Sequence, residues 1–163
     1  MSEKISFRLA NHEDKERLIG WLNDKDILSW FPMCNYREVE DSVRICLDYA
    51  KDKAALIVSY DGEPCGFGNL YLPAFKKISH QCLFMVVIDK NFRNKGIGTF
   101  LVKELMKMAK DKFKIKLFHL EVYVGNPAYN LYKRLGFHEF GYEKNFFKED
   151  GKYIDKRMMQ IKL

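Results

Sequence analysis

The segment "RNKGIG" (residues 93–98) combines two glycines with two cationic side chains. It follows the apolar run "CLFMVVID" and precedes a stretch with helical spacing of apolar residues, so it lies where a strand gives way to a helix. The start of a helix has unpaired N–H groups and a positive dipole, and both attract anions. Gly96 and Gly98 permit close approach of a phosphate, while Arg93 and Lys95 add positive charge. We therefore expect this turn to hold a pyrophosphate.

Two other kinds of phosphate-binding loop are excluded by the spacing of the glycines. A Walker loop needs G-x-x-x-x-G-K-[ST] and a dinucleotide fingerprint needs G-x-G-x-x-G, and the sequence contains neither. Gly96 and Gly98 are followed by Leu101 at the third glycine position, and Gly66 and Gly68 are followed by Tyr71. Glycine pairs before helices also occur in plain turns, so the six residues alone leave that interpretation open.

The periodicity of apolar residues around this turn predicts an α/β fold with a mixed sheet and the element order βααβββαβαββ. Strands are expected over residues 5–10, 54–60, 63–72, 80–89, 116–124, 137–147 and 153–163, and helices over residues 14–23, 36–52, 127–136 and from Ile97 onward. Residues 80–89 are almost entirely apolar, which is typical of a central strand covered on both faces. Asp61-Gly62 and Asp150-Gly151 suit tight hairpin turns.

Two segments in this order resemble the GNAT family of N-acetyltransferases. "VVIDKNFRNKGIGTFLV" resembles the family's acetyl-CoA signature, [QR]-x-x-G-x-[GA], between the fourth strand and the third helix. "LEVYVGNPAYNLYKRLGF" resembles its second block, a strand, an Asn, and a helix that carries L-Y and ends in G-F. The resemblance covers most of the chain and is weakest over residues 7–52. It implies a single GNAT domain over residues 1–163, with the fourth and fifth strands parallel and splayed apart.

The resemblance implies acetyl-CoA as the acetyl donor and no metal. The backbone amides of residues 94–99 would hold the pyrophosphate, and the backbone of residues 86–88 would pair with the pantetheine arm like an extra strand. Asn126 would bind a pantetheine amide, although it precedes Tyr132 by six residues where seven is the commonest family spacing. The implied cofactor-binding residues are Val86, Val87, Ile88, Arg93, Asn94, Lys95, Gly96, Ile97, Gly98, Thr99 and Asn126.

The family's reaction is direct attack of a primary amine on the acetyl thioester in a ternary complex, and the resemblance implies residues for two of its proton transfers. Tyr132, in the L-Y pair, would protonate the departing thiolate. Glu121 resembles the base of the ribosomal-protein alanine acetyltransferases, and a backbone N–H near Val87 or Ile88 would stabilise the oxyanion. His119 and a chain of waters are the alternatives to Glu121.

The acceptor is not identified by these motifs. His119, Glu121 and Tyr123 share one face of their strand, which suits an acceptor groove. The aromatic residues Trp30, Phe31 and Tyr36 occupy the region where the family shapes its acceptor site. The resemblance implies that the acceptor is a primary amine of a small molecule or a protein. Lys103, Lys107 and Lys110 either approach the ribose 3′-phosphate of the cofactor or form a solvated helix face.

Composition limits the remaining classes of function. The chain of 163 residues has a net charge of +6 and is 47% hydrophobic, as expected for one globular domain that binds anions. It contains no paired Cys/His finger, RNP motif or long basic run, which argues against nucleic acid, although a basic nucleic-acid module and an acyl-CoA sensor without turnover stay as alternatives.

No signal-like or membrane-spanning apolar run is present, so we expect a cytoplasmic protein without a membrane partner, acting as a monomer or a homodimer. Its thiols, Cys34, Cys46, Cys65 and Cys82, are too widely spaced for a zinc site or disulfide framework and are predicted to be buried.

Overall fold

The computed structural model describes residues 4–163, which form a seven-stranded mixed sheet in the order β1-β2-β3-β4-β5-β7-β6. The strands are β1 (Ile5–Leu9), β2 (Ala55–Tyr60), β3 (Glu63–Tyr71), β4 (Gln81–Ile88), β5 (Leu117–Tyr123), β6 (His138–Glu149) and β7 (Lys152–Lys162). The helices are α1 (Lys15–Leu22), α2 (Lys25–Leu28), α3 (Tyr36–Lys51), α4 (Ile97–Asp111) and α5 (Ala128–Arg134). The predicted fold class and element order are confirmed, and one short helix, α2, is added where an aromatic connection was expected.

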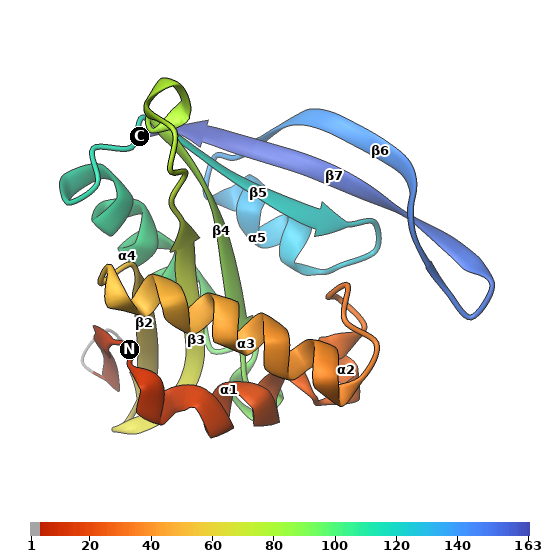
Figure 1. Cartoon of the computed structure of the whole chain (residues 1–163), viewed down its shortest axis with the longest axis horizontal. Helices are drawn as coiled ribbons and strands as arrows, with labels where there is room; N and C mark the ends of the chain where they lie inside the picture. Colours follow the sequence, from red (N-terminus) through yellow and green to blue (C-terminus); the bar gives the residue numbers. More distant parts are fainter. Residues whose placement is uncertain (1–3) are drawn as a thin grey trace.

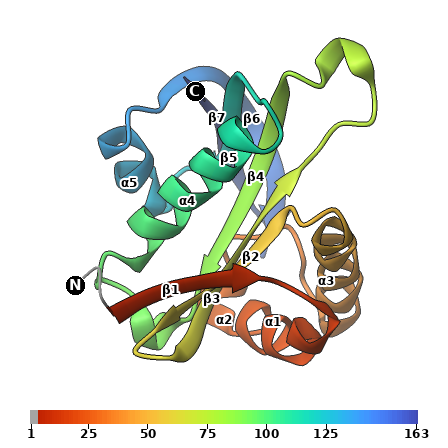
Figure 2. The same cartoon turned by 90° about the vertical axis from the view of Figure 1, so that its left-hand side faces the viewer.

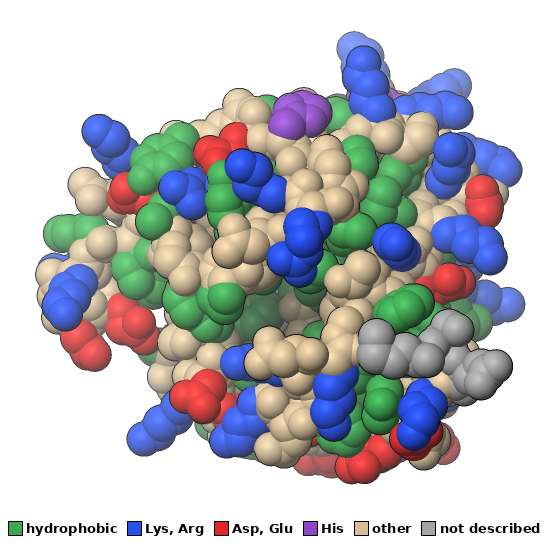
Figure 3. Space-filling model, turned by 180° about the vertical axis from the view of Figure 1, so that it is seen from behind, with side chains coloured by type: hydrophobic (Ala, Val, Ile, Leu, Met, Phe, Trp, Pro, Cys, Tyr) green, Lys and Arg blue, Asp and Glu red, His purple; other side chains and the backbone are tan. Residues whose placement is uncertain are grey.

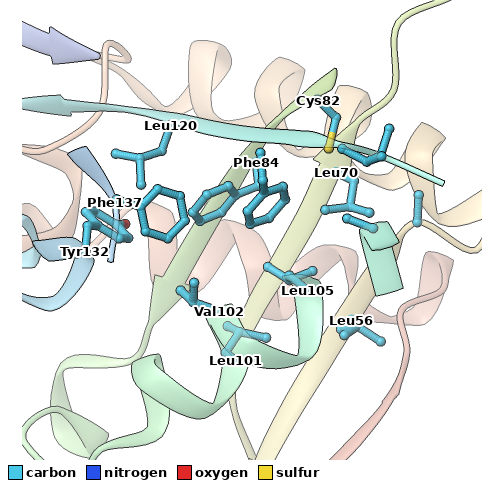
Figure 4. Close-up of a cluster of buried hydrophobic side chains, with 14 of the residues drawn as sticks. Leu56, Leu70, Cys82, Phe84, Leu101, Val102, Leu105, Leu120, Tyr132 and Phe137 are labelled. Atoms are coloured by element: carbon cyan, nitrogen blue, oxygen red, sulfur yellow. The ribbon is translucent and has the colours of Figure 1, made fainter. Parts of the chain in front are cut away.

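Helices cover both faces of the sheet. The helices α1 and α3 lie on one face, and α4 and α5 lie on the other (Figures 1 and 2). Alternate residues of β4 contribute to both cores, since Phe84 packs in the cluster beneath α4 and Val87 in the cluster beneath α1 and α3. Phe84, Phe137 and Tyr132 lie side by side in the first cluster, above Leu101 and Leu105 of α4 (Figure 4). The central position predicted for this strand is confirmed.

The parallel strands β4 and β5 separate along their length. They pair only where residues 81–83 face residues 117–119. Beyond this point β4 stays paired with β3 as far as Ile88, while β5 pairs along its full length with β7 and follows it away (Figure 1). The predicted splay is therefore confirmed, and it leaves one edge of residues 84–88 without a neighbouring strand.

Both predicted hairpin turns have the expected backbone. Asp61 and Gly62 have φ values of 49° and 83°, and Asp150 and Gly151 have φ values of 48° and 78°. These left-handed conformations match a turn whose twist suits antiparallel strands. The second turn closes the long β6–β7 hairpin, which projects from the body of the molecule (Figure 1).

The prediction of buried thiols is wrong for one cysteine. Cys46, Cys65 and Cys82 are buried, but Cys34 is exposed. Cys34 lies in the loop before α3, where its Sγ donates to Glu38 at 3.4 Å, so a polar contact replaces core packing. Within residues 4–163, no helix is long and apolar enough to cross a membrane.

The buried carboxylate of Asp14 predicts a dependence of stability on pH. Burial disfavours its ionised form, but Arg8, which donates at 2.8 Å, the Asn11 N–H and the charge of Arg17 outweigh that effect and hold the pKa of Asp14 below its ordinary value of 3.8. The stabilisation is therefore complete above that pH and lost as pH falls below it. Asp14→Asn is expected to lower the free energy of unfolding at pH 7 by about 2 kcal/mol, with a smaller difference in acid. Urea titrations at both pH values measure this.

The matched control for this experiment is Asp48→Asn. Asp48 contacts Lys51 at 2.7 Å on the exposed surface of α3, where ion pairs contribute little. The prediction for Asp14 fails if both variants unfold at the same urea concentration as the parent at pH 7.

Candidate active site

A cleft of about 360 Å³ opens where β4 and β5 separate. Most of its lining comes from β4, β5, α5 and the turn before α4. Of the residues predicted for the site, those that line the cleft are Val86, Val87, Ile88, Arg93, Asn94, Gly96, Ile97, Gly98, Thr99, Glu121, Asn126 and Tyr132. The fold thus brings together residues from four separate parts of the sequence.

The turn before α4 presents a row of free backbone donors. Asn94 and Gly96 have positive φ values of 62° and 75°, which turn the chain between β4 and the helix. Among the described residues, the N–H groups of residues 94–98 have no hydrogen-bond acceptor. The amide of Thr99 differs from the prediction, because it donates to the Gly96 carbonyl at 3.0 Å as the helix begins. Five donors at a helix start make this turn well suited to a phosphate.

The turn is fixed to the rest of the fold through Asp89. Its carboxylate accepts from the Asn91 N–H at 2.9 Å and from Nε1 of Trp21, on α1, at 3.1 Å. Of the cofactor-binding residues predicted from the sequence, Lys95 is the one whose side chain does not point into the cleft. Its ammonium lies 4.9 Å from the Phe92 ring centroid and 5.2 Å from that of Tyr60. Lys95 therefore contributes an amide to the turn, while its side chain packs on aromatic rings.

The charged residues around the cleft favour an anion on this side. The first turn of α4 contains no acidic residue, and Arg93 lines the cleft beside it. Arg134, at the end of α5, also lines the cleft and was missed by the sequence analysis, because it belongs to no recognised motif. The face of the molecule in Figure 3 is hollowed near its centre, with Lys and Arg side chains around the hollow. Lys103, Lys107 and Lys110 are exposed on α4 and do not line the cleft.

The free edge of β4 offers backbone groups to the cleft. The Asp89 N–H donates to the Cys65 carbonyl of β3 at 2.9 Å. Backbone groups alternate in direction along an antiparallel strand, so those of Val86 and Ile88 point away from β3 and toward the gap. The gap can therefore accept an extended chain of amides by hydrogen bonding along β4.

Tyr132 comes from α5 and lies at the base of the gap. Its ring is in edge contact with Phe84 and Phe137, and the residue is only 7% exposed (Figure 4). Burial raises the pKa of its phenol above the ordinary value, so the hydroxyl stays protonated at neutral pH. Among the described residues this hydroxyl has no hydrogen-bond partner, although Tyr132 lines the cleft. The phenol is therefore a proton donor with its donor capacity unused.

Glu121 lies on the opposite face of β5 from the core residues Leu120 and Val122. Its side chain is 42% exposed and lines the cleft, while its Oε1 accepts from Nζ of Lys156 on β7 at 3.2 Å. The same ammonium contacts Glu143 on β6 at 3.2 Å. The carboxylate is thus both accessible from the cleft and held in place by an ion pair.

The two other residues on this face of β5, His119 and Tyr123, are less accessible from the cleft than Glu121. His119 does not line the cleft, and desolvation lowers the pKa of its imidazole. Tyr123 is buried against Phe146 and Phe147, and this burial raises its pKa to about 12. Glu121 is therefore the one residue of the three that presents a polar group to the cleft.

Asn126 lies in the loop between β5 and α5. Its Oδ1 accepts from the Ala128 N–H at 2.9 Å, which helps to start the helix. Its amide nitrogen makes no hydrogen bond among the described residues, so Asn126 can donate that group to a bound molecule.

The aromatic residues predicted for the acceptor site divide into two groups. Trp30 and Phe31 line the cleft, whereas Tyr36 is exposed at the start of α3 and does not. Ile27, on α2, and Met85, on β4, also line the cleft and were missed. Met85 could have been predicted, because alternation along β4 places it on the same face as Val87. Ile27 could not, because nothing in the sequence marked α2 as a separate helix.

The sheet is mixed, and its central parallel strands separate beside a helix start that can accept an anion. This combination defines an acetyltransferase type of fold. The chain belongs to the Acetyltransferase (GNAT) family, whose model matches residues 9–137. It is 28% identical over 105 residues to L-amino acid N-acetyltransferase AaaT of Escherichia coli, which covers 64% of this chain and 65% of the relative. It is 37% identical over 86 residues to an N-alpha-acetyltransferase of Sulfurisphaera tokodaii, which covers 52% of this chain and 50% of the relative.

Solved structures agree with this assignment of the fold. The structure of yncA from Salmonella typhimurium, solved with its cofactor acetyl-CoA, superimposes with a TM-score of 0.82 over 98% of this chain and 94% of that chain, at 17% identity. The sequence matches above span only half to two thirds of the curated relatives.

Proposed function

We propose that the protein transfers an acetyl group from acetyl-CoA to a primary amine. The observation that carries this proposal is the cleft itself, in which the free amides of residues 94–98, the carboxylate of Glu121 and the phenol of Tyr132 meet. The family and the acetyl-CoA bound to yncA support it. We also propose that residues 1–163 form one such domain, because a single sheet runs from Ile5 to Lys162. The free thiols favour a cytoplasmic location.

The cleft fits the chemistry of acetyl-CoA on two independent observations. A pyrophosphate needs several donors at one point, and residues 94–98 supply five free N–H groups with Arg93 beside them. A pantetheine arm contains amides that need partners, and the free edge of β4 at Val86 and Ile88, together with Asn126, supplies them. When bound, acetyl-CoA supplies an activated acyl group as a thioester.

The residues of the chain then have three tasks. An acceptor ammonium with a pKa near 10 must lose a proton, and Glu121 is the accessible carboxylate for that step, directly or through water. The gap-facing N–H of Val86, which lies further from the turn than Ile88, is a fixed donor suited to the carbonyl oxygen that gains negative charge, in place of the donor expected near Val87 or Ile88. The buried phenol of Tyr132 would give a proton to the leaving thiolate, and the second proton that the attacking nitrogen loses would restore the phenol.

The test of this proposal is a panel of primary amines assayed with acetyl-CoA by release of free thiol. Amine-dependent thiol release, with acetylated product detected by mass spectrometry, is the expected result. An acyl-CoA-binding sensor would bind acetyl-CoA by calorimetry and release no thiol with any amine. The presence of both Glu121 and Tyr132 in the cleft supports turnover over the sensor.

Gly98→Val is expected to weaken acetyl-CoA binding at least tenfold, or about 1.4 kcal/mol. A Cβ at Gly98 would lie 3.5 Å from Leu131 Cδ2 and 3.9 Å from Ile88 Cγ1, which are ordinary contacts, so the fold should tolerate it. The two methyl groups beyond that Cβ would occupy the cleft at the helix start. Calorimetric titration with acetyl-CoA measures the change.

Gly20→Val is the matched control, since Gly20 lies on α1 and no atom beyond its own stretch of helix lies within 4 Å of its Cβ position. An affinity that is unchanged in Gly98→Val, or equally reduced in both variants, would show that the turn does not hold the cofactor.

A further inference from the structure

The sheet divides the cleft into two chemically different halves. Tyr132, Leu131 and the turn before α4 lie on the side of α4 and α5, where the cofactor is proposed to bind. The other side faces α1 to α3, and we call its lining the acceptor half. The acceptor half consists of Ile27, Trp30, Phe31, Met85, Val87 and Glu121.

The acceptor half is apolar except for one carboxylate. Val87 and Ile27 are buried, and Met85 and Phe31 pack against the same core cluster. Trp30 reaches across the opening, with its Cη2 3.9 Å from the position that a Cβ on Gly125 would take. A molecule that enters here therefore meets aliphatic and aromatic surface on the side of the helices and Glu121 on the side of β5.

Among the described residues, no cationic one lines the acceptor half of the cleft. Among the described residues that line the cleft, Arg93 and Arg134 are the cationic ones, and they come from the turn and from α5. The ammonium closest to Glu121 belongs to Lys156, which is only 5% exposed. It lies 3.2 Å from Glu121 and 3.2 Å from Glu143, with the Phe146 ring centroid at 3.5 Å, so its charge is fully compensated.

We infer that the acceptor is a primary amine with an apolar substituent and with neither a free carboxylate nor a second ammonium group. This inference rests on the proposed function, because it identifies the substrate class of the same cleft. The ammonium is attracted by Glu121, and the substituent buries its surface against Phe31, Met85 and Val87. A carboxylate would face Glu121 without a free cation, and a second ammonium would lose its hydration on an apolar wall.

The experiment compares acceptors that differ in one group, with kcat/KM measured by thiol release. From n-propylamine to n-pentylamine, where the ammonium pKa is constant, we expect a rise of about fourfold per methylene. The compound 1,4-diaminobutane replaces the terminal methyl of n-pentylamine with an ammonium and should be at least tenfold poorer. Leucine adds a carboxylate to 3-methylbutylamine and should also be at least tenfold poorer.

Two variants of the protein test the two surfaces separately. Phe31→Ala should flatten the alkylamine series while acetyl-CoA affinity stays constant, and Tyr36→Ala, at an exposed aromatic outside the cleft, should leave the series unchanged. Glu143→Gln releases Lys156 from one carboxylate, so the use of leucine should rise at least threefold relative to 3-methylbutylamine.

The outcomes distinguish this inference from the proposed function. Turnover that favours leucine or 1,4-diaminobutane over its apolar partner would overturn the inference and leave acetyl transfer standing. An unchanged leucine ratio in Glu143→Gln would overturn the role given to Lys156. Thiol release with none of these amines, despite acetyl-CoA binding, would overturn the proposed function and the inference together.

Discussion

Glu121→Gln is expected to lower kcat/KM at neutral pH by roughly 10²-fold, the contribution of a positioned general base. The amide keeps the shape of the side chain and can still accept a hydrogen bond from Lys156, but it cannot take a proton from the acceptor. The loss should shrink as pH rises toward the ammonium pKa near 10, because more of the amine is then neutral without help. Steady-state assays from pH 7 to pH 10 with one alkylamine measure both effects.

The structure provides a matched control in Glu143→Gln. Glu143 makes the same 3.2 Å contact with Lys156 but does not line the cleft, so its loss removes an ion pair without removing a base. Alkylamine turnover in this variant should stay within about twofold of the parent, because the buried Lys156 keeps its ion pair with Glu121 and the half-exposed Glu143 lies outside the cleft. A loss in Glu121→Gln that is equal at every pH would assign Glu121 to positioning of the acceptor, with water as the base.

The parts of the site that lie close together in sequence were predictable from local patterns. The helix start at Ile97 and the glycines before it are a contiguous signal, and the structure places Gly96 at φ 75° as the residue before the helix. Alternation along β5 predicted that Glu121 would lie on the face opposite Leu120 and Val122, and the core assignments agree. Period-2 and helix-start patterns depend on neighbouring residues alone, so one sequence is enough to show them.

The parts that depend on tertiary contacts were not predictable in this way. The ion pair of Glu121 with Lys156 joins residues 35 apart in sequence, through the pairing of β5 with β7. The placement of Ile27 in the cleft depends on α2, a single helical turn of four residues, which is too short to show a period. Cysteine is usually buried, which is why the sequence predicted a buried Cys34. Its exposure goes with a contact between its Sγ and Glu38, which only the folded structure shows.

The expected result for Tyr132→Phe is a fall in kcat of roughly 10²-fold with nearly constant acetyl-CoA affinity, since proton donation to the leaving thiolate belongs to the transition state. The substitution keeps the ring contacts with Phe84 and Phe137 and deletes a hydroxyl that has no partner among the described residues, so thermal stability should hardly change. Turnover, calorimetry and thermal unfolding of the same variant separate these quantities.

The control for Tyr132 is Tyr129→Phe, one turn earlier on α5. Its exposed hydroxyl donates to Glu139 at 2.5 Å, and Tyr129 does not line the cleft. Removing that phenol should leave kcat unchanged, because its proton is directed to the surface. Full turnover in Tyr132→Phe would contradict the acid role whatever happened to its melting temperature, and the thiolate would then have to be protonated by solvent. An equal loss of kcat in both variants would instead attribute the effect to a shift of α5, since the two tyrosines share that helix and only Tyr132 opens to the cleft.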